Sequence, residues 1–272
     1  MDTISNRLQG VPATLYIPLT ARIYVSRRFP DFFCDPKALE LASALPDDSI
    51  ERRAKEYPHL ASVCRYYHLD KMVQAFMERY SVCNVVNLGC GLETAYWRLQ
   101  PPEGVTFYEM DLPDVIERRR QVLGSSVGDR LVAGDLFDLR WADAIDTSLP
   151  TLLTVSGVFQ YFRREQVLDF IRQARDRFAL AELIFDAIGS QGIAYANRFV
   201  RRTGNTAAQM HFYIDDSREF ARAADVVIVE ARDFFREPRR ILGRRITLYS
   251  RLAMRIARHG PFRSALYHLK LN

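Results

Sequence analysis

The 272-residue sequence lacks any apolar run near the roughly 18 residues that a membrane span requires. Its first residues, MDTISNRLQGVP, lack the basic start and apolar stretch of a secretion signal. Cysteine is scarce and forms no C-x-x-C pair, so zinc ligation is not indicated and we predict no metal site. We therefore expect a cytoplasmic protein whose four thiols are reduced, at Cys34, Cys64, Cys83 and Cys90.

A strong charge excess is also missing. The sequence has 38 Lys and Arg against 33 Asp and Glu, and this mild surplus does not indicate a nucleic-acid partner. Apolar residues make up 48% and charged residues 26%, as in globular proteins. The length suits one elaborated α/β domain and leaves the oligomeric state open.

Two phosphate-binding signatures are absent. There is no P-loop, and in VVNLGCGLET the pair Gly89 and Gly91 is followed by Thr94 where a G-x-G-x-x-G motif has its third glycine. A pyrophosphate cradle is therefore disfavoured. Two glycines directly after an apolar run form either a tight strand-to-helix turn or a place where a ligand approaches the main chain closely.

What is present is an alternation of short apolar runs with helical patterns, which predicts βαβ units and a parallel sheet. Residues 1–80 are mostly helical in pattern, with Asp35 and Pro36 as a typical helix start. The final SALYHLKLN alternates apolar and polar residues, as a half-buried edge strand would. The other predicted strands are 82–88, 105–110, 130–133, 152–155, 181–185 and 226–229.

Residues 187–222 form a polar stretch between two predicted strands. Ordinary connections have about 4–6 residues. We expect an irregular insertion here that covers a binding site.

Acidic residues stand at the ends of the second and third predicted strands. Asp111 follows Gly91 by 20 residues, and a carboxylate at this place accepts the hydroxyls of a ribose. Asp135 could accept from the amino group of an adenine. Either residue alone is better explained as a helix cap or loop carboxylate. Together with the glycine turn they favour a nucleoside site.

Several ordered blocks resemble the leucine carboxyl methyltransferase family, which includes polyketide O-methyltransferases. The most specific are VVNLGCGLETAYWRL and YEMDLPDVIERRR. FFCDPKALEL, CRYYHLD, VAGDLFDLRW, VSGVFQYF, LIFDA and FYIDDSRE match further blocks in order. The resemblance implies a Rossmann-like class I methyltransferase with seven strands, the last antiparallel, and S-adenosylmethionine as the methyl donor. It divides the chain into a helical N-terminal lid, 1–80, and a methyltransferase domain, 81–272, with a substrate-cap insertion at 187–222.

The resemblance also assigns roles to single residues. Arg65 is expected to bind the methionine carboxylate of the donor, for which a guanidinium offers a bidentate fork. Asp111 is expected to hold the ribose, and Asp135 and Leu136 to flank the adenine. Without the resemblance, Arg65 is better explained by a surface ion pair with Asp70 or Glu56. The expected cofactor-binding residues are Arg65, Asn87, Gly89, Cys90, Gly91, Asp111, Leu112, Asp135, Leu136 and Ser156.

Ser156 departs from the family pattern. Related proteins usually have a glutamate here, in a motif like A-E-G-V-x-x-Y, and that acid faces the amino group of the donor. The sequence TVSGVFQYF has serine instead. A hydroxyl still accepts a hydrogen bond, but charge-assisted bonds are about twice as strong. Binding of the donor without turnover therefore stays open as an alternative.

Two kinds of acceptor chemistry fit the sequence. A carboxylate, ionised above a pKa of about 4, needs only a cationic clamp, for which Arg198 is a candidate beside Arg201 and Arg202. A phenol, with a pKa of about 10, gains from a base such as His211. The alternatives are solvated arginines and a structural histidine. Tyrosines that could line a pocket are Tyr161, Tyr195 and Tyr213.

The segment REPRRILGRRITLYSRLAMRIARH has eight arginines up to residue 258 and a single acid, Glu237. Its apolar residues recur at helical spacing and predict an amphipathic helix. That helix either packs on the sheet with its arginines in solvent or docks on an anionic surface or an acidic partner. Aromatic residues are not interleaved as a nucleic-acid stacking platform requires, so nucleic acid is disfavoured.

The sequence thus favours an S-adenosylmethionine-dependent O-methyltransferase acting on a small acid or phenol. A carboxyl methyltransferase for a peptide or protein C-terminus and a non-catalytic donor-binding protein remain as alternatives.

Overall fold

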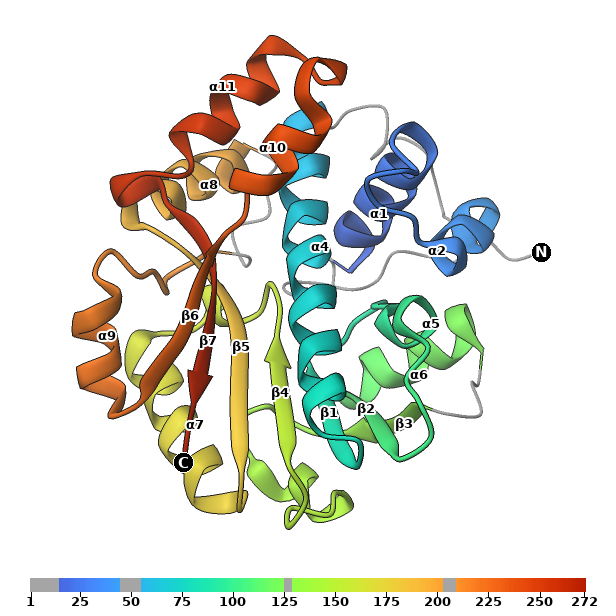
Figure 1. The fold of residues 1–272 in the computed structure, drawn as a ribbon, viewed down its shortest axis with the longest axis vertical. Helices are drawn as coiled ribbons and strands as arrows, with labels where there is room; N and C mark the ends of the chain where they lie inside the picture. Colours follow the sequence, from blue (N-terminus) through green and yellow to red (C-terminus); the bar gives the residue numbers. More distant parts are fainter. Residues whose placement is uncertain (1–14, 45–54, 125–128, 203–208) are drawn as a thin grey trace.

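The computed structural model describes residues 15–44, 55–124, 129–202 and 209–272, with only the backbone for 199–202. A seven-stranded sheet in the order β3-β2-β1-β4-β5-β7-β6 crosses the molecule (Figure 1). β1 to β5 pair in parallel, and β7 pairs antiparallel with both β5 and β6, which confirms the predicted fold class. The strands are β1 (Cys83–Leu88), β2 (Val105–Asp111), β3 (Asp129–Ala133), β4 (Thr151–Val155), β5 (Ala181–Ile188), β6 (Val227–Asp233) and β7 (Ser264–Lys270).

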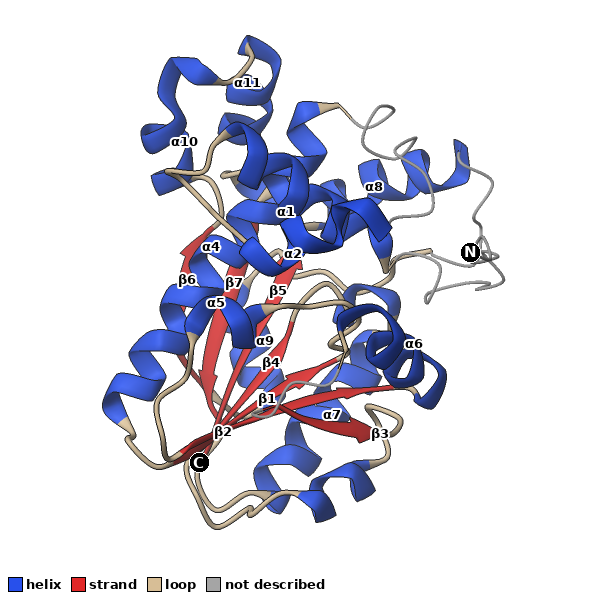
Figure 2. Cartoon of the chain, turned by 90° about the vertical axis from the view of Figure 1, so that its right-hand side faces the viewer, coloured by secondary structure: helices blue, strands red, loops and turns tan. Residues whose placement is uncertain are grey.

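Helices cover both faces of the sheet, as Figure 2 shows edge-on. One core holds apolar side chains of α1, α4, α10 and α11 against one face. The other holds those of α7 and α9 against the opposite face. The helices are α1 (Tyr16–Arg28), α2 (Pro36–Glu40), α4 (Glu56–Arg79), α5 (Ala95–Leu99), α6 (Pro113–Leu123), α7 (Arg164–Arg177), α8 (Ser190–Arg202), α9 (Ser217–Ala224), α10 (Arg236–Leu242) and α11 (Leu248–Ile256). Short 3₁₀ turns are η2 (Leu41–Ala44), η3 (Leu139–Ala144), η4 (Phe159–Tyr161), η6 (Gly243–Arg245) and η7 (Gly260–Phe262).

The prediction that the last strand lies at the sheet edge is wrong. β7 lies between β5 and β6, and all of its residues except Lys270 are buried. The alternation of apolar and polar residues predicted an exposed edge, but one of the polar residues, His268, has its hydrogen-bond partner inside the protein. His268 Nε2 lies 2.6 Å from Glu182 Oε2, and the same carboxylate accepts from Arg79. A buried polar side chain with such partners does not need solvent.

The segment 187–222 is not irregular as expected. β5 continues to Ile188, α8 follows at once, and α9 begins at Ser217, so ordered elements account for most of it. Residues 203–208 lie outside the described residues. The role of this segment as a substrate cap stays a prediction.

The proposed boundary at residue 80 also stays a prediction. α4 shares a core with the sheet, since its side chains cluster with Val85 and Leu152. The predicted helix start is confirmed, because the Asp35 side chain accepts from the Ala38 amide at 2.9 Å. Among the described ranges, no helix is long and apolar enough to cross a membrane. No group of three or more His, Cys, Asp or Glu side chains there could hold a metal.

An aromatic cluster fixes the middle of the sheet to the elements that follow β4 and α8. Phe185 on β5 is fully buried, and its ring lies 5.4 to 6.1 Å from those of Phe159, Phe212, Phe220 and Tyr267. Such contacts add to the free energy gained by removing the rings from water.

We predict that Phe185→Ala lowers the free energy of unfolding by about 3–5 kcal/mol, because it leaves a cavity where four rings meet. Urea titration followed by circular dichroism measures this loss. Tyr213→Ala is the matched control, since Tyr213 is exposed beside the same cluster and should change stability by about 0.5 kcal/mol or less. Equal losses in the two variants would contradict this role for the cluster.

Candidate functional site

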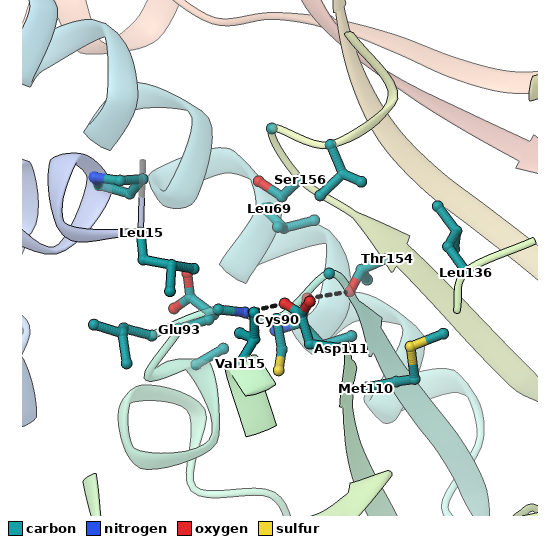
Figure 3. Close-up of a pocket in the computed structure, with 18 of the residues that line it drawn as sticks. Leu15, Leu69, Cys90, Glu93, Met110, Asp111, Val115, Leu136, Thr154 and Ser156 are labelled. Carbon is teal, nitrogen blue, oxygen red and sulfur yellow. Dashed lines mark hydrogen bonds between the residues drawn. The ribbon is translucent and has the colours of Figure 1, made fainter. Parts of the chain in front are cut away.

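A cavity of about 540 Å³ lies at the carboxyl ends of the central strands. β1 and β4 are neighbours whose chains continue to opposite sides, β1 towards β2 and β4 towards β5. In open α/β sheets, ligands bind at this reversal of strand order. Ligand pockets have volumes of about 300–1,000 Å³, and this cavity falls within that range. Figure 3 shows side chains at this place from β2, from β4 and from the residue after β4, among them Asp111, Thr154 and Ser156.

The glycine turn after β1 forms part of the cavity wall and has little room for a side chain. Gly89 and Gly91 both have positive φ angles, of 70° and 48°. A Cβ atom on Gly89 would lie 2.5 Å from Cγ2 of Val158, and one on Gly91 would lie 2.8 Å from Cδ2 of Leu15. Both neighbours also line the cavity. The turn therefore presents bare main chain to whatever occupies the space.

Asp111 at the end of β2 lines the cavity with its carboxylate held in place. Its two oxygens accept from the backbone amides of Gly91 and Leu112, each at 2.8 Å. Burial raises the pKa of Asp111, while these two hydrogen bonds lower it. A carboxylate has about four acceptor positions, so two remain for hydroxyl donors in the cavity.

Asn87, Cys90, Leu112, Asp135 and Leu136 line the same cavity. Asp135 Oδ1 accepts from the amide of Phe137 at 2.9 Å. The Asn87 amide is already used inside the sheet, where its Nδ2 donates to Glu109 Oε2 at 2.8 Å. Nine of the ten expected cofactor-binding residues therefore border one space.

Arg65 is the exception, because it does not line the cavity. Its Nη1 pairs with Asp186 on β5 at 3.2 Å. Its role in binding the donor stays a prediction. The alternative expectation of a surface pair is wrong, since Asp70 binds Arg98 instead and the Arg65 side chain is only 11% exposed. Burial lowers the pKa of Arg65, but Asp186 and a neighbouring tyrosine raise it by more, so the guanidinium stays charged.

The guanidinium lies directly beside Gly157, which does line the cavity. A Cβ atom on Gly157, whose φ is 74°, would lie 2.8 Å from Nη1 of Arg65. Two buried polar atoms in this corner have no hydrogen-bond partner among the described residues, Nε of Arg65 and Oγ of Ser156. Orphaned buried polar atoms next to a cavity indicate a place for a polar ligand group.

A buried charge cluster that the sequence did not predict forms another part of the cavity wall. Arg22 of α1 pairs with Asp35 at 2.9 Å and with Glu93 at 3.4 Å. Arg98 of α5 pairs with Asp35 at 3.0 Å, with Glu93 at 2.7 Å and with Asp70 at 2.8 Å. We call Arg22, Asp35, Asp70, Glu93 and Arg98 the buried charge cluster. All but Asp35 line the cavity.

Tyr66, another lining residue that was not predicted, lies among three cations. Its ring centroid is 4.9 Å from the guanidinium carbon of Arg22, 5.1 Å from that of Arg65 and 5.6 Å from that of Arg98. A ring face attracts cations, and the attraction is strongest where water is excluded. Tyr66 therefore connects the buried charge cluster to the Arg65 corner.

The two residues expected to act on the acceptor lie elsewhere. His211 and Arg198 are exposed, and neither borders the cavity. Of the three tyrosines, Tyr161 lines the cavity, whereas Tyr195 and Tyr213 are exposed. The side chains of Arg201 and Arg202 lie outside the described residues. Catalytic roles for His211 and Arg198 stay predictions.

The cavity fits the expected cofactor. Bare glycine main chain, a fixed carboxylate at the end of β2 and two orphaned polar atoms beside Gly157 suit a nucleoside that carries an amino acid. A sheet with this strand order and such a cavity defines a class I S-adenosylmethionine-dependent methyltransferase.

Comparison with known proteins narrows the class. The family model described as leucine carboxyl methyltransferase matches residues 19–175, and the chain belongs to this family. The predicted cofactor, S-adenosylmethionine, is confirmed at the level of the family.

Individual relatives are also named as methyltransferases. The chain is 26% identical over 202 residues to the tetracenomycin polyketide synthesis O-methyltransferase TcmP of Streptomyces glaucescens, covering 74% of this chain and 75% of that one. It is 26% identical over 232 residues to the S-adenosyl-L-methionine-dependent methyltransferase dpfgK of Gibberella zeae, covering 78% of each. A Thermobifida fusca protein, named as a candidate methyltransferase, has a TM-score of 0.59 and 16% identity over 92% of this chain and 93% of that one. This last likeness shows the fold alone.

We predict that the buried charge cluster makes the protein sensitive to acid. Burial raises the pKa of Glu93, but Arg22 and Arg98 lower it further, to about 2 from an ordinary value of 4.5. As the pH falls through 4.5, Glu93 therefore takes up a proton in the unfolded chain but stays ionised in the folded protein. Stability from this group is complete above pH 4.5 and is lost as the pH falls towards 2.

Urea-unfolding free energies measured across this range test the prediction. The Glu93→Gln variant should lose stability less steeply than the wild type, whereas Glu103→Gln, at an exposed site, should follow the wild type. Parallel curves for all three proteins would exclude an ionised Glu93 as a source of stability.

Proposed function

We propose that this protein transfers the methyl group of S-adenosylmethionine to an oxygen atom of a small molecule. The observation that carries the proposal is the cavity at the β1–β4 reversal, with Asp111 fixed at one side and the Arg65 corner at the other. The similarity to TcmP, named as an O-methyltransferase, supports oxygen as the acceptor atom.

In this proposal, different residues of the cavity bind different parts of the donor. Asp111 accepts from the ribose hydroxyls, and Asp135 with Leu136 flanks the adenine. Arg65 and Ser156 face the amino-acid end of the donor. The bound donor supplies an electrophilic methyl group, and alignment with the acceptor contributes about 7–11 kcal/mol to catalysis of such displacements.

The charges around the cavity favour a neutral acceptor. Two arginines of the buried charge cluster line it, but each is paired with carboxylates. Among the described lining residues, four acids outnumber these two cations: Asp70, Glu93, Asp111 and Asp135. A carboxylate acceptor would meet repulsion without a free clamp. A hydroxyl group of a small molecule therefore suits this lining better than an acid.

The apolar part of the lining also favours a small acceptor. Leu69 and Val73 of α4, with Val115, Val158 and Phe162, lie around the same space as the charged groups. Leu15, just before α1, and Pro18 of α1 also line it, so N-terminal residues form part of the wall. A hydroxylated ring or chain suits such a mixed lining better than the C-terminus of a folded protein.

Transfer of a labelled methyl group tests this function. Purified protein is incubated with methyl-labelled S-adenosylmethionine and, separately, with phenols, small acids and an extract of cellular protein. Label in a phenol or alcohol is the expected result. Label only in protein would support a carboxyl methyltransferase of C-termini, and donor binding without transfer to any acceptor would support the non-catalytic alternative.

We predict that Asp111→Asn weakens binding of S-adenosylhomocysteine by about 10- to 100-fold, because a charge-assisted hydrogen bond contributes about 1.5–3 kcal/mol. Isothermal titration calorimetry measures this change. Asp138→Asn is the matched control, since Asp138 follows β3 nearby but does not line the cavity. Unchanged affinity in Asp111→Asn would mean that the ribose lies elsewhere.

A further inference from the structure

The arginine-rich segment 236–258 forms two helices at one extremity of the molecule. α10 and α11, joined by η6, lie at the top of both views, beyond the carboxyl ends of the central strands (Figures 1 and 2). This segment is not needed for the proposed chemistry, because none of its residues lines the donor cavity.

The apolar residues of the segment divide into two sets. Leu242, Ile246 and Met254 are buried in the core shared with α1 and α4. A second set projects from α11 into solvent, with exposed fractions of 50 to 76%. Its members are Leu248, Tyr249, Leu252 and Ile256.

Three of the exposed residues, 248, 252 and 256, follow one another at steps of four and so share one helix face. The buried set already attaches α11 to the protein. The exposed face is therefore an apolar stripe without a partner inside the described chain. Contiguous exposed apolar patches on protein surfaces often mark binding sites.

The same segment carries exposed arginines. Arg236, Arg240, Arg244 and Arg255 are exposed, and none has an acidic partner among the described residues. Glu237, the single acid in the segment, pairs with Lys71 of α4 at 2.9 Å. The segment thus combines an exposed aliphatic stripe on α11 with guanidinium groups on α10, η6 and α11.

We propose that α10 and α11 dock the protein peripherally on an anionic lipid surface. An amphipathic helix binds such a surface by burying its apolar face about 5–10 Å into the boundary between head groups and acyl chains. Leu248, Leu252 and Ile256 enter that layer, while Arg240, Arg244 and Arg255 contact the phosphates. Each arginine near an anionic bilayer raises the partition coefficient about fivefold.

The same charges disfavour a second copy of this chain as the occupant. A two-fold contact through α11 would bring each stripe and its arginines against the identical arginines of the partner. The stripe projects from a helix rather than lining a cleft, and projecting aliphatic side chains can enter a lipid layer without a preformed pocket. An acidic protein could pair with the arginines, but it would also need an apolar groove to accept the stripe.

Co-sedimentation with vesicles tests the proposal. The full chain is mixed with vesicles of phosphatidylcholine alone and of phosphatidylcholine with phosphatidylglycerol. We expect binding to the anionic vesicles only. The triple variant Arg240→Gln, Arg244→Gln, Arg255→Gln should bind on the order of 100-fold more weakly. The double variant Leu248→Ser, Leu252→Ser should lose at least about tenfold.

Matched controls separate this face from general surface effects. Val227→Ser, Val229→Ser removes two exposed apolar side chains from the edge strand β6, and Arg120→Gln, Arg172→Gln removes two exposed arginines from α6 and α7. Both controls should bind vesicles as the wild type does. Binding of S-adenosylhomocysteine by every variant verifies folding independently of lipid.

Three results would overturn the proposal. They are equal binding to neutral and anionic vesicles, equal losses in the control variants, and no vesicle binding by the wild type. A dimer that Leu248→Ser, Leu252→Ser dissociates, in a protein without vesicle binding, would assign the stripe to a second copy. Capture of an acidic protein without vesicle binding would assign it to that partner.

Discussion

The arrangement of the site depends on the buried charge cluster. Two guanidiniums and three carboxylates from α1, the start of α2, α4, the loop after β1 and α5 meet where almost no water reaches them. Burying these charges is costly, and removing one member of such a set typically costs 3–5 kcal/mol because its partners stay unpaired. The N-terminal helices are therefore held in one position relative to the glycine turn. This attachment, together with the apolar packing of α1, holds the part of the cavity wall that Leu15 and Pro18 form.

The buried charge cluster also affects which guanidinium group is available to bind the donor. Arg22 and Arg98 are each satisfied by two or more carboxylates, and Arg22 Nη2 donates to the carbonyl of Leu92 at 2.6 Å. Arg65 has a single carboxylate, Asp186, and an unpartnered Nε. Among the described arginines in or beside the cavity wall, Arg65 is therefore the one whose charge is least neutralised. A role assigned to Arg65 by resemblance thus has a physical reason in this chain, although its guanidinium lies behind Gly157 rather than in the open cavity.

Local signals in the sequence predicted the local parts of this structure. The apolar runs gave the parallel strands, and the glycines and Asp111 lie together because strand ends meet at one edge of a sheet. The buried charge cluster was not predictable in this way, since Arg22 and Glu93 are 71 residues apart and charged residues are normally expected in solvent. β7 was misplaced because Glu182 satisfies His268 across strands. In the segment 236–258, helical spacing predicted one amphipathic helix, whereas the chain forms two, α10 and α11, separated by η6. Spacing also does not show which apolar residues are buried, and Tyr249, Leu252 and Ile256 are not.

The serine at position 156 changes how charge is distributed at the amino-acid end of the cavity. A glutamate there would place a carboxylate in the same corner as Arg65. In this chain the compensating carboxylate is Asp186, which also accepts from the amide of Gly157 and so belongs to the scaffold of the sheet rather than to the ligand. In the binding mode that we propose, the donor ammonium faces a neutral hydroxyl whose Oγ has no partner among the described residues. Because a charged acceptor bonds an ammonium about twice as strongly as a neutral one, this binding mode relies less on the amino group of the donor and more on its carboxylate and ribose. Loss of that single acid therefore need not abolish binding, provided that Arg65 and Asp111 keep the positions that the sheet gives them.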